Sequence, residues 1–232
     1  MLSIILPVFN ESRCNYLDRI LQNLSQLDSA EIIIIDGGST DDTVSRINNA
    51  GFSVLELPDS SRAARLNYGL DAASGELIFL HHPRSLVSPD ILAGLETRLG
   101  VSRPCWGGLS HQFDLQHPLL RFTSWYSNRI RCDWRGIVYL DHCLFLHRSF
   151  VDQGYRFPAV EIFEDTRFSL QLRQKQKPIR LKDFCTTSAI RFSRNGIYRQ
   201  ALLNQMLKIG FWLKTSPKTM NRHYEKGLEL NE

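Results

Sequence analysis

A chain of 232 residues, 43% of them hydrophobic, is long enough to bury the core of one large α/β domain. The formal net charge is only +4, and the basic residues that gather after Arg167 form no dense stripe with interleaved aromatics, so nucleic acid is not an expected partner. The five cysteines are widely spaced and contain no CxxC pair, which gives no support to a zinc site or a disulfide framework.

Apolar runs alternate with helical patterns through residues 1–100. The predicted strands cover residues 2–8, 32–35, 52–57 and 77–80. Uninterrupted apolar strands, each followed by a helical segment, predict a mostly parallel sheet that is covered by helices on both faces. Ligands of such sheets bind at the carboxyl ends of the strands.

The helices between these strands have recognisable boundaries. The first has one apolar face running from Leu17 to Leu27. Thr40 is predicted to cap the second helix, with Asp41 and Asp42 in its first turn. The third helix is expected to begin after Ser60 or Ser61 and to end at Gly75. Pro89 is predicted to open a helix that ends at residue 99.

The second half of the chain is less regular. Strands are predicted over residues 106–113 and 138–146, and an edge strand over 179–187. Helices are predicted over residues 118–131, 166–175 and 197–213, the last of them ending before Pro217. There is no repeat, low-complexity tract or linker, so we expect one domain with two functional halves.

The apolar run at the N-terminus is predicted to be a strand and not a signal peptide, because no cationic segment precedes it and Pro7 interrupts it. No apolar stretch reaches the length that spans a membrane. We expect a cytoplasmic chain, with peripheral membrane association as an alternative. A basic C-terminal half suits a phosphate-bearing ligand or an anionic membrane surface.

Polar side chains follow the first two strands where each strand ends. Asn10, Glu11 and Asp36 fall at adjacent strand ends, where Asp36 can accept hydrogen bonds from a nucleoside and Pro7 and Val8 can line a base pocket. Each residue taken alone is explained by helix capping or by an ordinary strand end. Their order and spacing together favour nucleotide binding.

Two further groups are candidates for chemistry. Arg62 stands at the start of a predicted helix, where a guanidinium and free backbone amides suit a diphosphate, although a solvated arginine is the simpler alternative. Glu164 and Asp165 precede another helix, and a carboxylate there can act as a general base or can simply favour the helix start.

The motifs together resemble family 2 glycosyltransferases, which have the GT-A fold. The resemblance is carried by LSIILPVFNES at residues 2–12 and EIIIIDGGSTDDT at 31–43, and then by SRAARLNYGLDAASGELIFL, FEDTRFSLQLR and SAIRFSRNGIYRQALLNQMLKIGFWL. The order of these pieces is similar to a compact bacterial subgroup. The resemblance implies a Rossmann-like sheet with a nucleotide-sugar half at residues 1–100 and an acceptor half at 101–232.

The resemblance also implies roles for individual residues. Asp165 matches the catalytic base of an inverting transferase, and Glu164 would orient it or bind the acceptor. The residues expected at the donor are Pro7, Asn10, Glu11, Asp36, Gly38, Arg62 and Asn67, and those at the acceptor sugar are Asp141, His142 and Arg173. His142 departs from the glutamine of the subgroup, and a buried strand histidine explains it equally well.

The largest departure from the family follows the fourth strand. Relatives have an Asp-x-Asp motif there that binds Mg²⁺ or Mn²⁺, whereas this chain has His81, His82 and Pro83. Proline cannot bind a metal, hard cations prefer oxygen, and two successive strand residues point to opposite faces. A histidine metal site, metal-free catalysis and an inactive protein all remain open. Arg84 follows directly and could supply a fixed cation to the leaving diphosphate.

The last predicted helix has an apolar stripe made of Ile197, Ala201, Leu202, Met206, Ile209 and Leu213. The pattern favours a helix that packs on the core. The alternative is an interfacial helix that contacts a membrane near a lipid-linked acceptor.

The sequence therefore predicts an inverting glycosyltransferase that moves a sugar from a nucleotide diphosphate-sugar to an acceptor hydroxyl, on a sugar or a lipid-linked molecule. The alternative is a catalytically inactive nucleotide-sugar-binding or scaffold protein of the same fold. A nucleotidyltransferase would need paired metal-binding carboxylates and a glycine-rich, basic N-terminal loop, and the N-terminus has neither.

Overall fold

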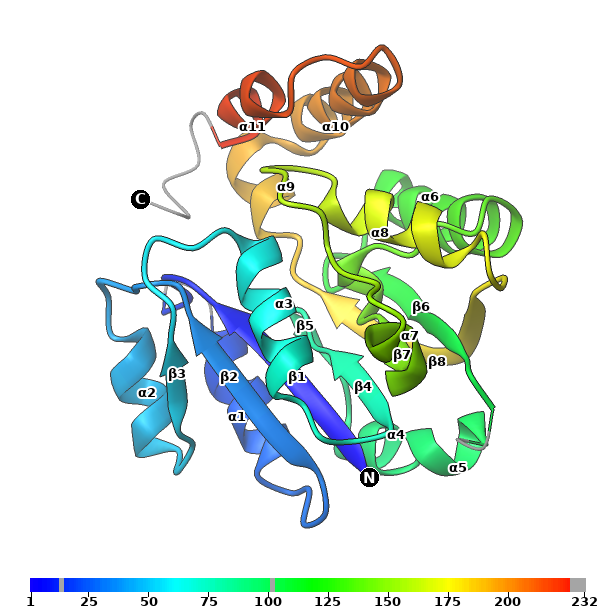
Figure 1. The fold of residues 1–232 in the computed structure, drawn as a ribbon. Coiled ribbons are helices and arrows are strands. Elements are labelled where there is room, and N and C mark those ends of the chain that lie inside the picture. The colour runs from blue at the N-terminus through cyan, green and yellow to red at the C-terminus, as the bar shows by residue number, and fades with distance from the viewer. Residues whose placement is uncertain (13–14, 101–102, 226–232) are drawn as a thin grey trace.

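The computed structural model describes residues 1–12, 15–100 and 103–225, and its strands form one eight-stranded sheet (Figure 1). The strands are β1 (Leu2–Val8), β2 (Glu31–Asp36), β3 (Val54–Glu56), β4 (Leu77–Leu80), β5 (Ser85–Leu86), β6 (Trp106–Phe113), β7 (Phe145–His147) and β8 (Ile179–Thr187). Their order across the sheet is β3-β2-β1-β4-β7-β6-β8-β5. The pairs β1–β2, β1–β4, β2–β3 and β6–β8 are parallel, and β4–β7, β6–β7 and β5–β8 are antiparallel.

Helices flank both faces of this sheet, as the GT-A expectation requires. In the first half they are α1 (Tyr16–Leu24), α2 (Thr43–Asn49), α3 (Arg62–Ala72), α4 (Pro89–Ala93) and α5 (Leu95–Leu99). In the second half they are α6 (Pro118–Tyr126), the π-helix η1 (Ser127–Trp134), the 3-10 turn η2 (Leu140–His142), α7 (Arg148–Asp152), α8 (Glu164–Leu172), α9 (Ile190–Asn195), α10 (Ile197–Trp212) and α11 (Pro217–Glu225).

The core is divided by the sheet into two layers. On one face, α1 packs Leu17 and Ile20 against Ile4 and Leu6 of β1. On the other face, α3 packs its apolar residues against Ile5 and the strands on either side of it. Because alternate residues of β1 are buried on opposite faces, the whole strand is apolar, which is why the sequence identified it so clearly.

The predicted α/β fold class is confirmed, and so are the strands at residues 2–8, 77–80, 106–113 and 179–187. Strand β8 is an edge strand for most of its length, since β5 pairs with it only at Thr186 and Thr187. The strand predicted over residues 52–57 is shorter, at Val54–Glu56. The helix predicted from Pro89 to residue 99 is divided at Gly94 into α4 and α5.

The strand predicted over residues 138–146 is wrong for most of its length. Only its last two residues belong to β7, and η2 occupies the middle of the range. Backbone amides there bind side chains of α8: Val138 N donates to Ser169 Oγ at 3.1 Å, and Leu140 N donates to the Asp165 carboxylate at 3.2 Å. Amides engaged in this way cannot join a ladder with a neighbouring strand.

Two predicted helix ends also differ. The helix predicted over residues 118–131 changes after Tyr126 to the wider π winding of η1, which continues to Trp134. The second helix starts at Thr43 and not directly after Thr40, because the preceding segment is held by Asn10, whose Oδ1 accepts from Thr40 N at 2.9 Å. Asp41 and Asp42 therefore precede the helix.

The core-packing interpretation of the last helix holds for Ile197 and Ala201, which pack against Leu120 and Phe192, and is wrong for the rest of the predicted stripe. Its buried residues are Gln200 and Leu207, while Leu202, Met206 and Ile209 of the apolar stripe are mostly exposed. Pro217 ends no continuing helix but opens α11, and α10 and α11 lie at the end of the molecule toward which β1 and β2 run (Figure 1). The described cysteines, Cys105, Cys132, Cys143 and Cys185, are buried free thiols, and Cys14 lies outside the described residues.

Candidate active site

A cavity of about 880 Å³ opens at the carboxyl ends of β1 and β2, between the two halves of the chain. Both halves contribute to its walls. Of the residues that the sequence singled out, Pro7, Glu11, Gly38, Arg62, His82, Arg84, Asp141, Glu164 and Asp165 line it. The cavity therefore brings the donor and acceptor candidates together, as the topology of a parallel sheet requires.

Asp36 does not line this cavity, and its carboxylate is already engaged. It is 2% exposed; its Oδ2 accepts from Gly38 N at 2.8 Å and from Ser39 N at 2.7 Å, and the Ser39 hydroxyl donates to its Oδ1. The side chain thus shapes the loop that brings Gly37 and Gly38 to the cavity. The expected direct hydrogen bonds from Asp36 to a nucleoside stay a prediction.

Asn10 and Asn67 also act within the fold. Asn10 has a left-handed backbone (φ 50°), and its side chain joins the loop after β1 to the loop after β2 through Thr40. Asn67 accepts from Phe157 N at 2.8 Å and donates to Phe157 O at 2.9 Å, which ties α3 to the second half. Neither residue lines the cavity.

Two of the predicted acceptor residues, Arg173 and His142, also do not line the cavity. Arg173 lies at the exposed end of α8 and donates to Arg135 O at 2.7 Å, outside the cavity. His142 is fully buried behind the wall, with Nε2 at 2.7 Å from Ser127 Oγ and Nδ1 at 2.9 Å from Leu109 O. Burial lowers the pKa of His142 to about 4, so the ring is neutral near pH 7.

Two arginines of the cavity are paired with carboxylates from distant parts of the chain. Arg62 Nε donates to Glu164 Oε1 at 2.5 Å, which joins the start of α3 to the start of α8. Arg84 Nε donates to Glu11 Oε2 at 2.8 Å. The side chains of Arg84 and Glu11 are 12% and 7% exposed, so the arginine that follows Pro83 turns inward and not toward solvent.

Arg65 is a third cavity-lining arginine, and the sequence interpretation did not include it. It lies over the Phe9 ring, 5.6 Å from the ring centre, and donates through Nη1 to Ser60 O at 2.7 Å. Its buried Nε has no hydrogen-bond partner among the described residues. Burial, reinforced by nearby Arg62, lowers the pKa of Arg65, which is the behaviour of a cation that lacks a close anion.

The carboxylate of Asp165 is held by backbone amides at the start of α8. Oδ1 accepts from Thr166 N at 2.6 Å and Oδ2 accepts from Leu140 N at 3.2 Å. Burial, with the charge of neighbouring Glu164, raises the pKa of Asp165 to about 6. A fixed carboxylate with a pKa in this range is mostly ionised at neutral pH and can still accept a proton.

Asp141 of η2 and Arg131 of η1 also line the cavity, with His111 of β6 buried behind them. Asp141 lies 3.7 Å from His111 Nε2 and 4.0 Å from His142 Nε2. Burial opposes the charge of Asp141, but these histidines and Arg131 lower its pKa overall. Because the histidines themselves are buried and have lowered pKa values, Arg131 is the cation that persists near pH 7.

Arg131 lines the cavity and was also missed from the sequence. Its guanidinium lies 4.0 Å from the centre of the Tyr139 ring, and Nη1 donates to Ser127 Oγ at 3.1 Å. No sequence pattern pointed to Arg131. In the structure it belongs to the π-helix η1, and π-helical turns are often found at functional sites.

The residues after β4 do not fit a divalent metal. His82 Nδ1 accepts from Arg84 N at 3.2 Å, so the neutral ring carries its proton on Nε2 and neither nitrogen has a free lone pair. His81 is 1% exposed and packs its ring against Phe79, away from the cavity. Within residues 1–12, 15–100 and 103–225, no group of three or more His, Cys, Asp or Glu could hold a metal ion.

Residues 3–95 match the family model described as Glycosyl transferase family 2. No curated protein sequence matches the chain. Among the helices described, none is long and apolar enough to cross a membrane.

Several solved structures share this fold. S. aureus TarS 1-349 in complex with UDP-GlcNAc has a TM-score of 0.63 and 18% identity, over 81% of this chain and 58% of that one. Mannosyltransferase PcManGT from Pyrobaculum calidifontis, in complex with GDP-Man and Mn²⁺, has a TM-score of 0.60 and 18% identity, over 80% and 56%.

Glucosyl-3-phosphoglycerate synthase from Mycobacterium tuberculosis, in complex with Mn²⁺ and UDP-glucose, has a TM-score of 0.59 and 16% identity, over 79% of this chain and 69% of that one. The chain spans about three fifths of the length of the TarS 1-349 chain. At these identities the solved structures establish the fold. Residues 3–95 therefore carry the glycosyltransferase family 2 pattern, within a chain that has the GT-A fold.

Proposed function

We propose that the chain is an inverting glycosyltransferase that transfers a sugar from a nucleoside diphosphate-sugar to an acceptor hydroxyl. The observation that carries the proposal is the shared cavity, in which the buried carboxylate of Asp165 and the arginines Arg62, Arg65 and Arg84 line one space. The proposal includes the division into a nucleotide-sugar half at residues 1–100 and an acceptor half at 101–232.

The donor is assigned to the first half. Neighbours of the same fold bind UDP-GlcNAc, GDP-Man or UDP-glucose, which supports a nucleoside diphosphate-sugar as the class of donor. Pro7, Phe9 and Gly38 line the part of the cavity next to β1 and β2, where a nucleoside would lie. Asp36 and Asn10 hold the loops of that wall and contribute through them.

The diphosphate is assigned to the arginines. Departure of a nucleoside diphosphate leaves negative charge on its terminal phosphate, which a cation must stabilise. The residues after β4 do not supply metal ligands, whereas Arg84 enters the cavity from that position. Arg65, whose Nε lacks a partner among the described residues, adds positive charge that Glu11 and Glu164 do not neutralise directly.

The chemical step is assigned to Asp165. The acceptor oxygen attacks the anomeric carbon, the bond from that carbon to the diphosphate oxygen breaks, and Asp165 takes the hydroxyl proton. Attack opposite the leaving group inverts the configuration. Glu164 orients Arg62 and stands beside Asp165, and Asp141 with Arg131 forms a charged wall for the acceptor. The acceptor is a sugar or a lipid-linked hydroxyl.

A thermal-shift panel tests donor binding first. UDP, GDP and their sugars are added in EDTA and, separately, with Mn²⁺, and ATP serves as the control. A ligand at 100 times its Kd stabilises the fold by about 2.7 kcal/mol, roughly 5–10 °C for a chain of this size. Stabilisation by one nucleoside diphosphate in EDTA supports the donor site, and no response to any member of the panel overturns it.

Release of the nucleoside diphosphate separates a transferase from an inactive binding protein. The proposed enzyme hydrolyses its donor slowly in water and faster with an acceptor, and the released diphosphate is measured over time. Binding of the donor without any release, across sugar and lipid-linked acceptors, would favour the inactive alternative, for which the altered motif at His81, His82 and Pro83 is the main support.

A further inference from the structure

Helix α10 turns a mixed side into the protein, where Gln200 and Leu207 are buried, and an apolar stripe outward. Gln200, Asn204 and Lys208, which follow one another at four-residue spacing, line the cavity. On the opposite side Leu202, Met206, Ile209 and Leu213 are 59–74% exposed. A helix that only covers a protein core turns its large apolar side chains inward, whereas these four are mostly exposed among the described residues.

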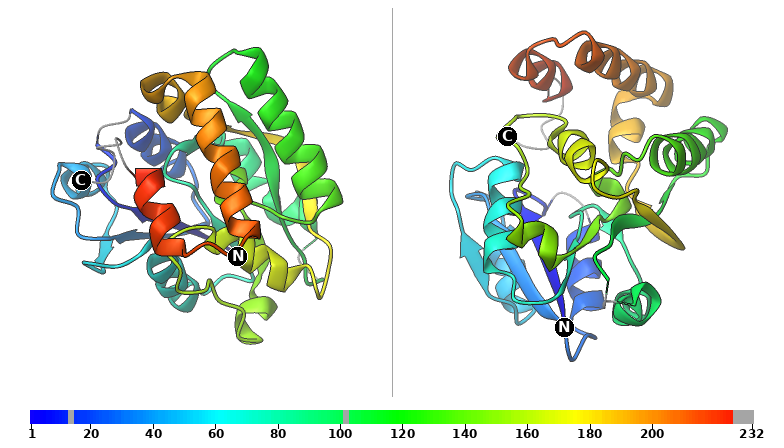
Figure 2. Two further views of the ribbon diagram at one scale, coloured as in Figure 1. Left: turned by 90° about the horizontal axis from the view of Figure 1, so that it is seen from above. Right: turned by 45° about the vertical axis from the view of Figure 1, so that its right-hand side comes forward.

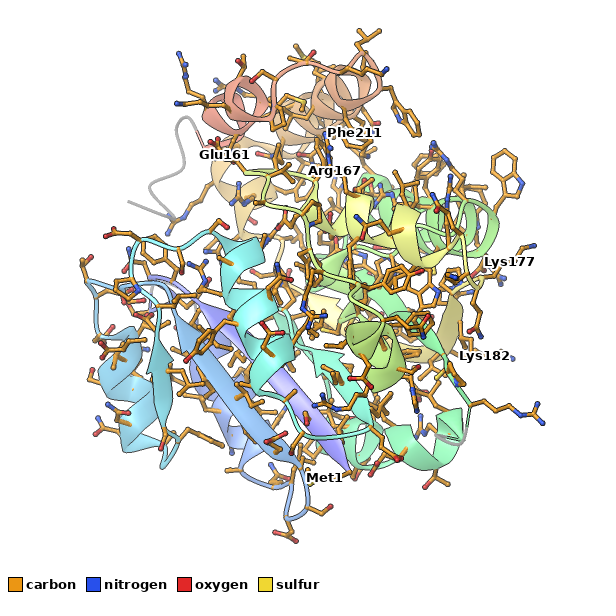
Figure 3. All side chains as sticks on the ribbon, viewed as in Figure 1. Met1, Glu161, Arg167, Lys177, Lys182 and Phe211 are labelled. Carbon is orange, nitrogen blue, oxygen red and sulfur yellow. The ribbon has the colours of Figure 1, made fainter. Side chains whose placement is uncertain are left out.

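The inner side of α10 is fixed to the rest of the molecule. The Phe211 ring lies 5.0 Å from the Phe163 ring, and the Arg167 guanidinium lies 5.8 Å from the Phe211 ring centre. Figure 3 shows Arg167 and Phe211 close together where α8 meets α10. These contacts hold α10 in one rotational setting, and its apolar side consequently stays at the surface.

Helix α6 lies beside α10 (Figure 2). The His117 and Tyr198 rings are 5.9 Å apart near the start of both helices, and Arg135, which follows η1, lies 4.8 Å from the Trp212 ring centre at the end of α10. Helix α10 therefore runs beside α6 and its continuation η1.

The neighbouring helix α6 also exposes a stacked aromatic pair. Phe122 and Trp125 are 58% and 51% exposed, and their ring centres are 5.7 Å apart. We call the resulting surface the apolar platform. Its members are Phe122, Trp125, Leu202, Met206, Ile209 and Leu213.

Basic residues outnumber acidic ones around the apolar platform. Residues 190–222 contain seven arginines and lysines and no aspartate or glutamate. Arg199 on α10, Lys214 just after it and Arg121 on α6 are exposed, while exposed Arg129 of η1 is paired with Asp133 at 3.5 Å. A second copy of this chain would bring like charges together across the interface. An anionic bilayer surface instead matches both the apolar residues and the basic residues around them. Aromatic and aliphatic side chains enter the bilayer interface, and basic side chains contact its headgroups.

We propose that the apolar platform docks on the headgroup region of an anionic membrane. The docking requires no spanning helix, because an interfacial helix lies flat in the surface. One helix, about 10 Å thick, would then separate the membrane from the cavity. If the proposed function holds, a lipid-linked acceptor would be met at this place. The docking itself is independent of catalysis and is measured without it.

Vesicle flotation of the full chain tests the docking. One set of vesicles contains phosphatidylcholine alone, and the other contains about 30% phosphatidylglycerol. We expect the protein to float with the anionic vesicles and to be released partly by salt. The double variant Leu202→Gln/Ile209→Gln should partition at least about 10-fold more weakly. Leu55→Gln/Phe184→Gln, which alters exposed apolar residues away from the apolar platform, is the matched control and should bind as wild type.

Tryptophan quenching provides a second measurement. Brominated lipids should quench the wild-type fluorescence, and Trp125→Phe should remove part of that quenching, because Trp125 is in the apolar platform while Trp106 is buried. Absence of binding to both vesicles, or unchanged binding of the Leu202→Gln/Ile209→Gln variant, overturns the proposal. A wild-type dimer that becomes a monomer in that variant would assign the surface to a second copy.

Discussion

Replacing Asp165 with asparagine separates the cost of its charge from its role in catalysis. The carboxylate is 8% exposed and accepts from two backbone amides, at 2.6 Å and 3.2 Å. Asparagine keeps the shape but cannot take a proton from an acceptor hydroxyl. We expect kcat to fall by about two to four orders of magnitude, equivalent to roughly 3–5 kcal/mol, while the donor still binds.

The expected effect on stability is small at pH 8 and can be estimated from the structure. Burial raises the pKa of Asp165 from 3.8 to about 6, so ionising it in the folded state costs about 3 kcal/mol at neutral pH. The neutral asparagine side chain would avoid this cost but would turn an amide donor toward one backbone N–H, at a cost of about 1–3 kcal/mol. The two effects nearly cancel, so Asp165→Asn should unfold at about the same urea concentration as wild type at pH 8.

The pH dependence gives the sharper test. Because the folded pKa is raised, the folded state binds more protons than the unfolded state between pH 4 and about 6. This contribution to the wild-type free energy of unfolding is present at low pH and is lost as the pH rises through about 6. The difference between variant and wild type should therefore move by about 2.5 kcal/mol in favour of the variant between pH 4 and pH 8.

Urea unfolding at several pH values measures the stability difference, and release of nucleoside diphosphate measures turnover. Turnover within a few-fold of wild type would show that another group takes the proton, and Glu164→Gln and Asp141→Asn would be tested next. A stability difference that does not change with pH would show that the Asp165 carboxyl carries no unfavourable charge, which refutes the raised pKa.

Four other outcomes follow from the site. In EDTA, Arg84→Ala should weaken nucleoside diphosphate binding at least about 10-fold by calorimetric titration, because Glu11 is left unpaired in the cavity. The control variant Arg46→Ala, which alters an arginine outside the cavity, should bind as wild type. Binding that needs Mn²⁺ and is unchanged in Arg84→Ala would contradict this prediction. Gly37→Ala would place a Cβ 2.0 Å from Arg65 Nη1 and displace that flexible guanidinium. The same titration should therefore show weaker binding with little loss of stability, and an unchanged affinity would remove Arg65 from the site. Asp36→Ala should lower the free energy of unfolding by about 2–4 kcal/mol in urea, because three hydrogen bonds of its loop are lost. A variant with wild-type stability that no longer binds the nucleotide would instead indicate that the Asp36 carboxylate contacts the nucleoside directly. Burial lowers the pKa values of His81 and His142 to about 4, so the unfolded state binds more protons below pH 6.5. The free energy of unfolding should therefore fall from pH 6.5 toward pH 4, by up to about 1.4 kcal/mol per pH unit for each histidine. His142→Gln should reduce this slope, and an unchanged slope would contradict the lowered pKa.

The first half of the fold could be predicted because its rules are local. An entirely apolar run such as that of β1 identifies a buried strand, and Ser61 before α3 identifies a helix start, whose Oγ indeed accepts from Ala64 N at 3.2 Å. The segment at residues 138–146 is also apolar, but its amides bind Ser169 and Asp165 of a helix more than twenty residues away. Periodicity carries no information about such a partner.

Sequence alone determined which strands end in polar residues, that Glu164 and Asp165 stand together at a helix start, and that Pro83 interrupts the expected metal motif. Only the tertiary structure decided what each polar side chain faces. The carboxylates of Asp36 and Asp165 are alike in the sequence, yet one is saturated by its own loop and the other lines the cavity. Arg65 lies among ordinary residues of α3 and becomes notable only because Phe9 and Gly37 enclose it. The stripe on α10 likewise has the same spacing whether it faces a core or the surface, and the side that packs is set by Phe163 and the cavity. Side-chain periodicity follows from local backbone geometry, whereas burial and charge depend on atoms that the fold brings from distant parts of the chain.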